Sequence, residues 1–370
     1  MVADQKLKLY RIYWSQFIQG LTQPSLPALI GTVGVATSVF CCCLLVITPT
    51  FIGTTGYGYF INGSTDEYGY LTSEVLRIKL IHSQSISIAL VGESSLREAI
   101  SDVTYLNQLV EKQIGQPVNS YDLMAGSLSH WEAVCLLDNL NENFRGVVVL
   151  YISPNALARE NDYLAELVRY PRLALDCPSF DAEVRIAELT IPNRFNNYFL
   201  NHYLFFIARQ SALLNFITGQ VQLERHKIAL WESVMNSQRW QSAIQRVKQW
   251  LEGENYHHNR QANFGVYARL IQRLQQSKQI QVALVESIRN PKIESIIYAT
   301  PAAKQLYSEY QMDMKEFVHK NNIVYWDIGK QINLQPDDFV DHTHLKNHQA
   351  RQRYTLVFAE LLAKRLLQIQ

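Results

Sequence analysis

Residues 86–96 read ISIALVGESSL, an apolar run that ends in a glycine, an acid and two serines. The run 86–91 predicts a buried strand, and apolar residues then recur at helical spacing from Leu96 to Ile114, just before Gly115. Gly92 permits a tight turn between the two elements. This stretch therefore predicts a strand, a turn and a helix, which is the repeating unit of an α/β fold.

The two serines of this turn are candidates for a nucleophile. Free N–H groups at the start of a helix stabilise negative charge, so Ser94 can attack a carbonyl while its own N–H helps to hold the oxyanion. Ser95 is a second candidate, because the direction of a side chain at a turn is not evident from sequence. A helix N-cap without chemistry is the alternative.

The same alternation of strand and helix continues along the chain. Further strands are expected at 118–124, 147–152, 280–285 and 323–326, and further helices at 130–140, 266–275, 304–319 and 348–367. This order predicts an open, mostly parallel sheet with helices on both faces. Ligands of such sheets bind beyond the carboxyl ends of the strands.

A second motif lies just before the last expected helix, where residues 341–345 read DHTHL. A serine needs a base to become a nucleophile, and that base needs a third group to fix its tautomer. His344 and Asp341 supply both if the fold returns this loop to Ser94. The alternatives are a solvated loop and a metal site that uses Asp341, His342, His344 and His348. The scaffolding usual for such ligands is not evident, so we expect no metal and no cofactor.

Taken together, these motifs resemble the SGNH (GDSL-type) hydrolases over residues 84–155 and 263–367. Gly92-Glu93-Ser94 matches the Gly-Asp-Ser block of the family, and Asp341 with His344 matches its Asp-x-x-His block. Gly126 matches the glycine of the second block, and residues 153–156 (SPNA) match Gly-x-Asn-Asp. Glu93, Ser153 and Ala156 depart from the family pattern.

The resemblance implies a three-layer α/β/α fold with a flavodoxin-like sheet and a serine esterase or O-acyltransferase. It implies a triad of Ser94, His344 and Asp341. It also implies an oxyanion hole formed by the N–H groups of Ser94 and Gly126 and the side-chain amide of Asn155.

The N-terminal part of the chain has a different character. No charged residue occurs between Arg11 and Asp66, and 28–48 is almost wholly apolar or small. About 21 residues at ~1.5 Å each give ~31 Å, close to the thickness of a bilayer. Basic residues precede the run and acidic ones follow it, which predicts a cytoplasmic N-terminus and an extracytoplasmic domain.

We therefore expect a cytoplasmic segment at 1–27, a transmembrane anchor at 28–52, a juxtamembrane linker at 53–80 and the α/β domain at 81–370. A cleaved signal peptide is the alternative to the anchor.

Residues 156–262 interrupt the α/β rhythm and are predicted to form a helical insertion. Its apolar helical segment 198–217 is interpreted as a lid or a membrane-leaning surface, with an ordinary buried helix as the alternative. Three of the five cysteines lie in the predicted anchor. Cys135 and Cys177 would face an oxidising compartment, where a disulfide between them is an open alternative.

The net charge of +1 and the lack of a basic stripe argue against nucleic-acid binding. An anchor keeps the site near the membrane or wall, so an acyl ester of an envelope polysaccharide is the expected substrate. The anchor makes the lipid bilayer an expected partner. A looser, architectural similarity to the membrane-anchored D protein of teichoic-acid D-alanylation and to alginate O-acetylation proteins implies a membrane acyltransferase as a further partner. Two other readings stay open: a catalytically weak SGNH-like domain that binds envelope polymer or scaffolds an acyltransferase, and a lipase.

Overall fold

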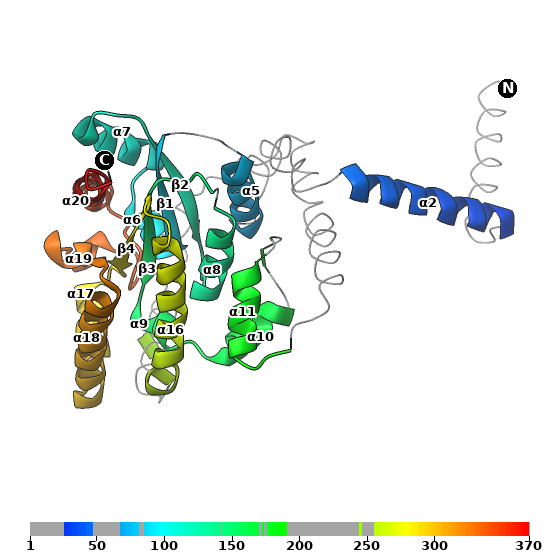
Figure 1. Cartoon of the computed structure of the whole chain (residues 1–370). Coiled ribbons are helices and arrows are strands. Elements are labelled where there is room, and N and C mark those ends of the chain that lie inside the picture. Colours follow the sequence, from blue (N-terminus) through cyan, green and yellow to red (C-terminus); the bar gives the residue numbers. More distant parts are fainter. Residues whose placement is uncertain are drawn as a thin grey trace, which may run out of the picture. The chain divides into compact units, whose positions relative to one another are not determined.

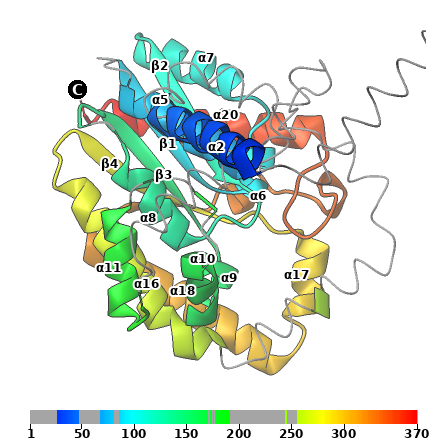
Figure 2. The same cartoon turned by 90° about the vertical axis from the view of Figure 1, so that its right-hand side faces the viewer.

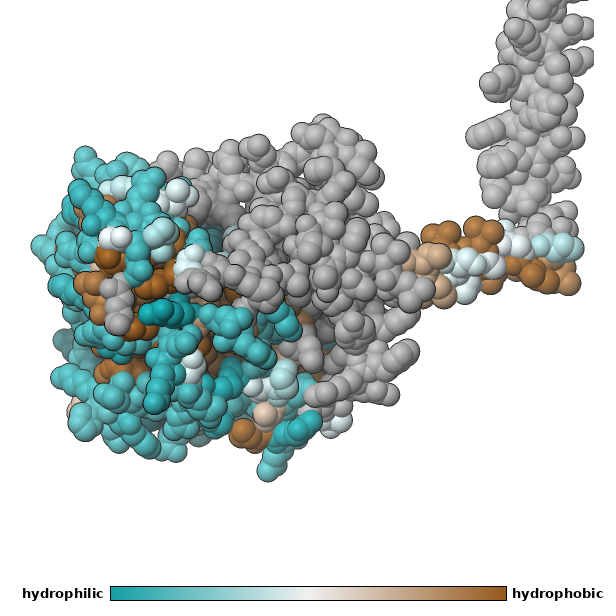
Figure 3. Space-filling model, turned by 45° about the horizontal axis from the view of Figure 1, so that its top comes forward, coloured by the Kyte–Doolittle hydropathy of each residue, from teal (hydrophilic) through white to brown (hydrophobic). Residues whose placement is uncertain are grey.

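The computed structural model describes residues 26–46, 67–80, 85–140, 142–169, 172–173, 175, 177–190, 244–245 and 255–369. The chain divides into two compact units, Met1–Ile52 and Gly53–Gln370. The first unit contains helix α2 (Leu26–Val46), drawn at the right of Figure 3. Its exposed apolar side chains include those of Leu26, Leu29, Ile30, Val33, Val35 and Val39. Among the described helices, none combines the length and the apolar character that a membrane span requires. The anchor expected at 28–52 stays a prediction, and its residues 47–52 lie outside the described part.

The second unit is built on a five-stranded sheet with the order β2-β1-β3-β4-β5 (Figure 1). All paired strands are parallel. The strands are β1 (Ile86–Glu93), β2 (Val118–Ala125), β3 (Gly146–Ile152), β4 (Ile280–Glu286) and β5 (Val324–Trp326). This confirms the predicted α/β class and parallel sheet, with an order consistent with a flavodoxin-like fold.

Helices cover both faces of the sheet, because alternate residues of each strand point to opposite sides. Val148 and Leu150 join one apolar cluster, whereas Val147 and Val149 join the other. The first cluster packs against α5 (Glu67–Leu80), α8 (His130–Asp138), α16 (Asn255–Gln275), α17 (Pro291–Ile297) and α18 (Pro301–Asn321). The second packs against α6 (Ser94–Ala99), α7 (Val103–Ile114), α19 (Ile328–Gln331) and α20 (His348–Leu366). Figure 1 shows α7 and α20 on one side of the strands and α5 and α8 on the other.

The helix expected from 96 to 114 is two helices. Helix α6 ends at Ala99 and α7 begins at Val103. The side chain of Asp102 accepts hydrogen bonds from the N–H groups of Thr104 (2.6 Å) and Tyr105 (3.0 Å), so it caps a new helix. The periodicity alone does not reveal this break, because apolar residues continue across it.

The predicted linker 53–80 is wrong over the residues that the structure describes, 67–80, which form α5. Leu71, Val75 and Ile78 follow the spacing of one helix face and are buried in the core. Because residues 53–72 are rich in Gly, Thr and Tyr, their composition indicated a linker and not a helix with an apolar face. In Figure 2, α5 lies in front of the strands together with α8.

The described ends of the predicted insertion belong to the domain core. Helices α9 (Pro154–Leu157), α10 (Asn161–Arg169) and α11 (Pro178–Ile186) bury Leu157, Leu164 and Val184. A disulfide joins Cys135 of α8 to Cys177, the residue before α11, with the two Cα atoms 4.9 Å apart. The predicted lid segment 198–217 lies outside the described residues.

Candidate active site

The site begins where β1 ends. Ser94 is the first residue of α6, directly after the strand. A Cβ atom on Gly92 would lie only 2.5 Å from the Cβ of Tyr151 on β3, so the close approach of the two strands here requires glycine. The turn thus places Ser94 at the carboxyl edge of the sheet, directly after β1.

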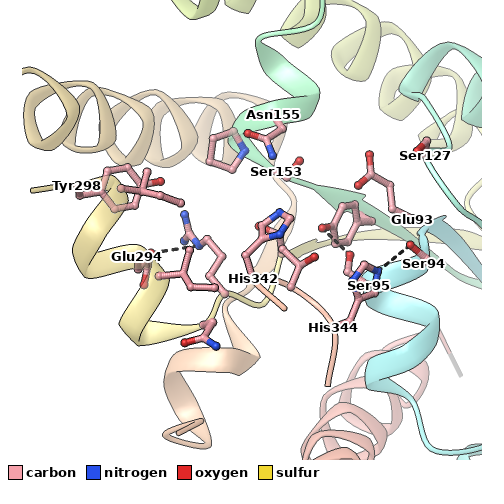
Figure 4. A pocket seen from close by; sticks show the side chains of 18 of the residues that line it. Glu93, Ser94, Ser95, Ser127, Ser153, Asn155, Glu294, Tyr298, His342 and His344 are labelled. Atoms are coloured by element: carbon pink, nitrogen blue, oxygen red, sulfur yellow. Dashed lines mark hydrogen bonds and ion pairs between the residues drawn. The ribbon is translucent and has the colours of Figure 1, made fainter. Parts of the chain in front are cut away.

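The predicted serine, histidine and aspartate meet in this structure. Ser94 Oγ lies 2.9 Å from His344 Nε2, and His344 Nδ1 lies 2.7 Å from Asp341 Oδ2. A dashed line joins Ser94 to His344 in Figure 4. Because an ionised carboxylate only accepts hydrogen bonds, the proton of the imidazole resides on Nδ1 and leaves Nε2 free to accept the serine proton. This is the tautomer that a general base for Ser94 needs.

Backbone contacts hold the loop that carries His344 and Asp341. Phe339 and Leu345 form an antiparallel bridge, and Val340 N–H donates to His344 O at 2.9 Å. Asp341 Oδ1 accepts from the N–H of His344 and from the N–H that precedes it, each at 2.8 Å. The carboxylate therefore fixes both its own loop and the imidazole.

The electrostatics of the pair favour a charged Asp341 beside a basic His344. Burial raises the pKa of Asp341, but its hydrogen bond to His344 and the neighbouring imidazole charges outweigh burial and lower that pKa to about 2. Burial lowers the pKa of His344, but the hydrogen bond and charge of Asp341 outweigh it, so that pKa is raised above its ordinary value of 6.5. A raised pKa makes His344 a stronger base.

The structure distinguishes the two candidate nucleophiles. Ser95 is buried, and its hydroxyl donates to Tyr151 Oη at 2.7 Å. The hydroxyl of Ser94 is the one that lies at His344. Which serine faces the base depends on the position of Tyr151 on β3. Tyr151 is remote from the two serines in sequence, so their neighbouring residues do not indicate the outcome.

The loop after β2 carries the predicted oxyanion donor Gly126. In the register of the sheet, Ala125 lies opposite Glu93, so Gly126 and Ser94 occupy matching positions one step beyond the paired strands. The N–H of Gly126 donates to the carboxylate of Glu67 on α5. This donor is therefore engaged by an acid that sequence reasoning had placed in a linker.

The third predicted donor, Asn155, lies on α9 and lines the same pocket as Ser94 and His344. Within the described part of the chain, no hydrogen bond joins its amide to Ser94. The triad is thus in hydrogen-bond contact and Asn155 lies on the wall of the pocket, whereas Gly126 is not among the residues that line it.

The pocket has a volume of about 270 Å³, near the lower end of ordinary ligand sites. Ser94 and His344 lie at one end and Glu294 and Tyr298 of the α17 region at the other (Figure 4). Sequence reasoning missed this second end. The residues at this end follow the predicted strand 280–285. Ligands of parallel sheets bind beyond the carboxyl ends of the strands, so this rule could have indicated them.

Two ion pairs set the charge of the pocket walls. Arg159 Nη2 lies 2.8 Å from the carboxylate of Glu93, the residue before Ser94. Burial raises the pKa of Glu93 above its ordinary value of 4.5, and the charges of Arg159 and His344 only partly oppose this shift. Arg289 Nε lies 3.2 Å from the carboxylate of Glu294. Each acid has a basic partner, so the walls carry paired rather than single charges.

Residues 341–348 also contain the ligands of the alternative metal site, Asp341, His342, His344 and His348. Among the residues that the structure describes, no group of three or more His, Cys, Asp or Glu side chains is placed to hold a metal ion. His342 lines the pocket beside His344. Comparison with known proteins adds no further assignment: no family model and no curated protein matches this chain.

Proposed function

We propose that this chain is an SGNH-type serine esterase or O-acyltransferase. The observation that carries the proposal is the continuous contact from Ser94 Oγ to His344 Nε2 and from His344 Nδ1 to Asp341. The three residues occupy the positions expected from the family motifs. They also lie at the carboxyl edge of a parallel sheet, where such folds bind their ligands.

In the first half-reaction, Ser94 Oγ bonds to the carbonyl carbon of an acyl ester and its proton passes to His344 Nε2. The carbonyl electron pair becomes an oxyanion, and Asp341 stabilises the imidazolium. The tetrahedral intermediate collapses, the bond to the leaving oxygen breaks, and that oxygen takes the proton from His344. An acyl-enzyme on Ser94 and a free alcohol result.

In the second half-reaction, water or an acceptor hydroxyl gives its proton to His344 and attacks the acyl carbon. The bond to Ser94 Oγ breaks, and Oγ recovers the proton. Water yields hydrolysis and a sugar hydroxyl yields transfer. The two activities share the acyl-enzyme and differ only in the nucleophile that reaches it.

Placement outside the cytoplasm is part of the proposal and rests on separate observations. The apolar, charge-free run at 28–48 is long enough for a membrane anchor, and basic residues precede it. The disulfide between Cys135 and Cys177 supports an oxidising compartment. An acyl ester of an envelope polysaccharide is the substrate that suits this location, with the lipid bilayer and a membrane acyltransferase as partners.

One observation favours the second candidate, a catalytically weak domain that binds envelope polymer or scaffolds an acyltransferase. The N–H of Gly126 donates to Glu67 and is not available to a substrate in this arrangement. An activity probe separates the two candidates, because only an active site with a functional nucleophile is labelled.

The test is intact-mass analysis of the full-length chain with p-nitrophenyl acetate and with longer acyl esters. The wild type is expected to gain one acyl group on Ser94, and Ser94→Ala none. Ser95→Ala is the matched control: it removes the adjacent hydroxyl and still forms the adduct. An adduct that persists in Ser94→Ala refutes the assignment. No adduct and no fluorophosphonate labelling in the wild type supports the non-catalytic candidate.

A further inference from the structure

The first turn of α5 contacts both the N–H and the carbonyl group of Gly126. The carboxylate of Glu67 accepts the N–H of Gly126, and Tyr68 Oη donates to the Gly126 carbonyl oxygen at 2.8 Å. Glu67 also forms an ion pair with Arg97 of α6. Arg97 is buried and lies three residues after Ser94. The carboxylate is thus bound between the loop of the predicted oxyanion donor and the helix of the nucleophile.

A carboxylate in this place opposes the proposed chemistry. The donor capacity of one N–H is largely taken by the acid that it already contacts. Oxyanion donors act in the transition state because they are oriented and free at the moment that charge develops. Gly126 therefore contributes fully only if Glu67 withdraws from it.

Contacts other than those of Glu67 also hold the loop that follows Gly126. Arg172 Nη2 donates to Ser127 O at 3.2 Å and also pairs with Glu132. Ser129 and Glu132 form a reciprocal capping box at the start of α8. These contacts lie directly after Gly126 and do not involve Glu67, although Arg172 also lies over the ring of Tyr68 on α5, 4.2 Å from its centroid.

We propose that Glu67 competes with the substrate carbonyl oxygen for the N–H of Gly126 and so restrains the oxyanion hole. This inference rests on the proposed esterase function. Glu67 is not a catalytic residue in this scheme; it acts through Gly126. Displacement of Glu67 adds a third donor to those of Ser94 and Asn155. Loss of one such donor costs ~10²–10³ in rate in a serine hydrolase, so freeing a donor leaves room for a gain of tenfold or more.

The experiment compares the full-length wild type with Glu67→Ala and Glu67→Gln. The readouts are the rate constant of fluorophosphonate labelling and kcat/KM for p-nitrophenyl acetate. Glu67→Ala is expected to raise both by about tenfold or more. Glu67→Gln is expected to raise them less, because a neutral amide oxygen still accepts from Gly126 but accepts more weakly than a carboxylate.

Tyr68→Phe is the matched control, because it removes a contact from the same helix turn to the same glycine and leaves the Gly126 N–H engaged. It is expected to give no acceleration. Glu67→Ala also removes a partner of the buried Arg97, so thermal unfolding is recorded for each variant, and Glu67→Gln decides the test if the alanine variant does not fold.

The outcomes separate the two proposals. If the wild type is labelled on Ser94 and neither Glu67 variant reacts faster, the competition is refuted and the esterase assignment stands. If Tyr68→Phe accelerates as much as Glu67→Ala, loosening of the loop is the cause and the competition is refuted. If no variant is labelled, the esterase assignment fails and the inference fails with it.

Discussion

Replacement of Asp341 by asparagine tests how the triad works. Asp341 Oδ1 accepts two backbone N–H groups and Oδ2 accepts from His344 Nδ1. Asparagine has one acceptor oxygen, and the two backbone donors retain it. Its NH₂ group then faces Nδ1 of His344, which must become an acceptor. The imidazole proton moves to Nε2, and His344 no longer takes the proton of Ser94.

Two magnitudes follow from this geometry. In a Ser-His-Asp triad the wrong tautomer costs about 10⁴ in kcat, which is about 5.5 kcal/mol of activation free energy. The pKa of Asp341 falls from 3.8 to about 2 on folding, which corresponds to about 2.5 kcal/mol in favour of the folded carboxylate. Because the folded pKa is the lower one, this stability is present above pH 3.8 and is lost as the pH falls toward 2.

The assay is the pH profile of kcat/KM for p-nitrophenyl acetate, together with chemical denaturation at neutral pH. In the wild type the activity requires neutral His344, so its acid limb lies above pH 6.5, because the pKa of His344 is raised. In Asp341→Asn the residual activity is expected to have its limb at lower pH, because burial then lowers the pKa of His344 without the opposing hydrogen bond and charge of Asp341.

The matched control is Asp338→Asn, because Asp338 lies in the same loop and accepts from Gln335 N–H at 2.9 Å. It tests loss of a loop contact without change at His344. The tautomer argument is refuted if Asp341→Asn lowers kcat by less than tenfold. It is also refuted if the acid limb of the pH profile stays at the wild-type pH.

Three further outcomes are expected. Asn155→Ala lowers kcat by ~10²–10³ without a change in unfolding temperature, and a kcat within twofold of the wild type removes Asn155 from the oxyanion hole. Gly92→Ala places a Cβ 2.5 Å from Tyr151 Cβ and destabilises the fold by about 1–3 kcal/mol in urea unfolding; unchanged stability contradicts the close approach of β1 and β3. Loss of the Cys135–Cys177 disulfide, which spans a sequence separation of 42, lowers stability by about 4 kcal/mol in the chain-entropy model; equal denaturation of the wild type with and without reductant contradicts this.

The strands and the sheet class were evident in the sequence. Buried parallel strands are continuous apolar runs, and this signal is local to five or six residues. The predicted strands at 86–91, 118–124, 147–152 and 280–285 accordingly agree with β1 to β4 within about two residues, the usual precision of such boundaries. Helix ends were less evident, because a cap such as Asp102 depends on one side chain.

The order of amino acids shows which residue types are available for chemistry and where they lie along the chain. Which of them meet depends on how the sheet and its loops pack. Ser94 and His344 are 250 residues apart and approach to 2.9 Å because strand order and loop contacts bring their two loops to one edge of the sheet. The same packing turns Ser95 toward Tyr151 and brings Glu67 to the N–H of Gly126. The spacing of apolar residues indicates which side of a helix or strand is buried. It gives no information on the distance between segments that are remote in sequence.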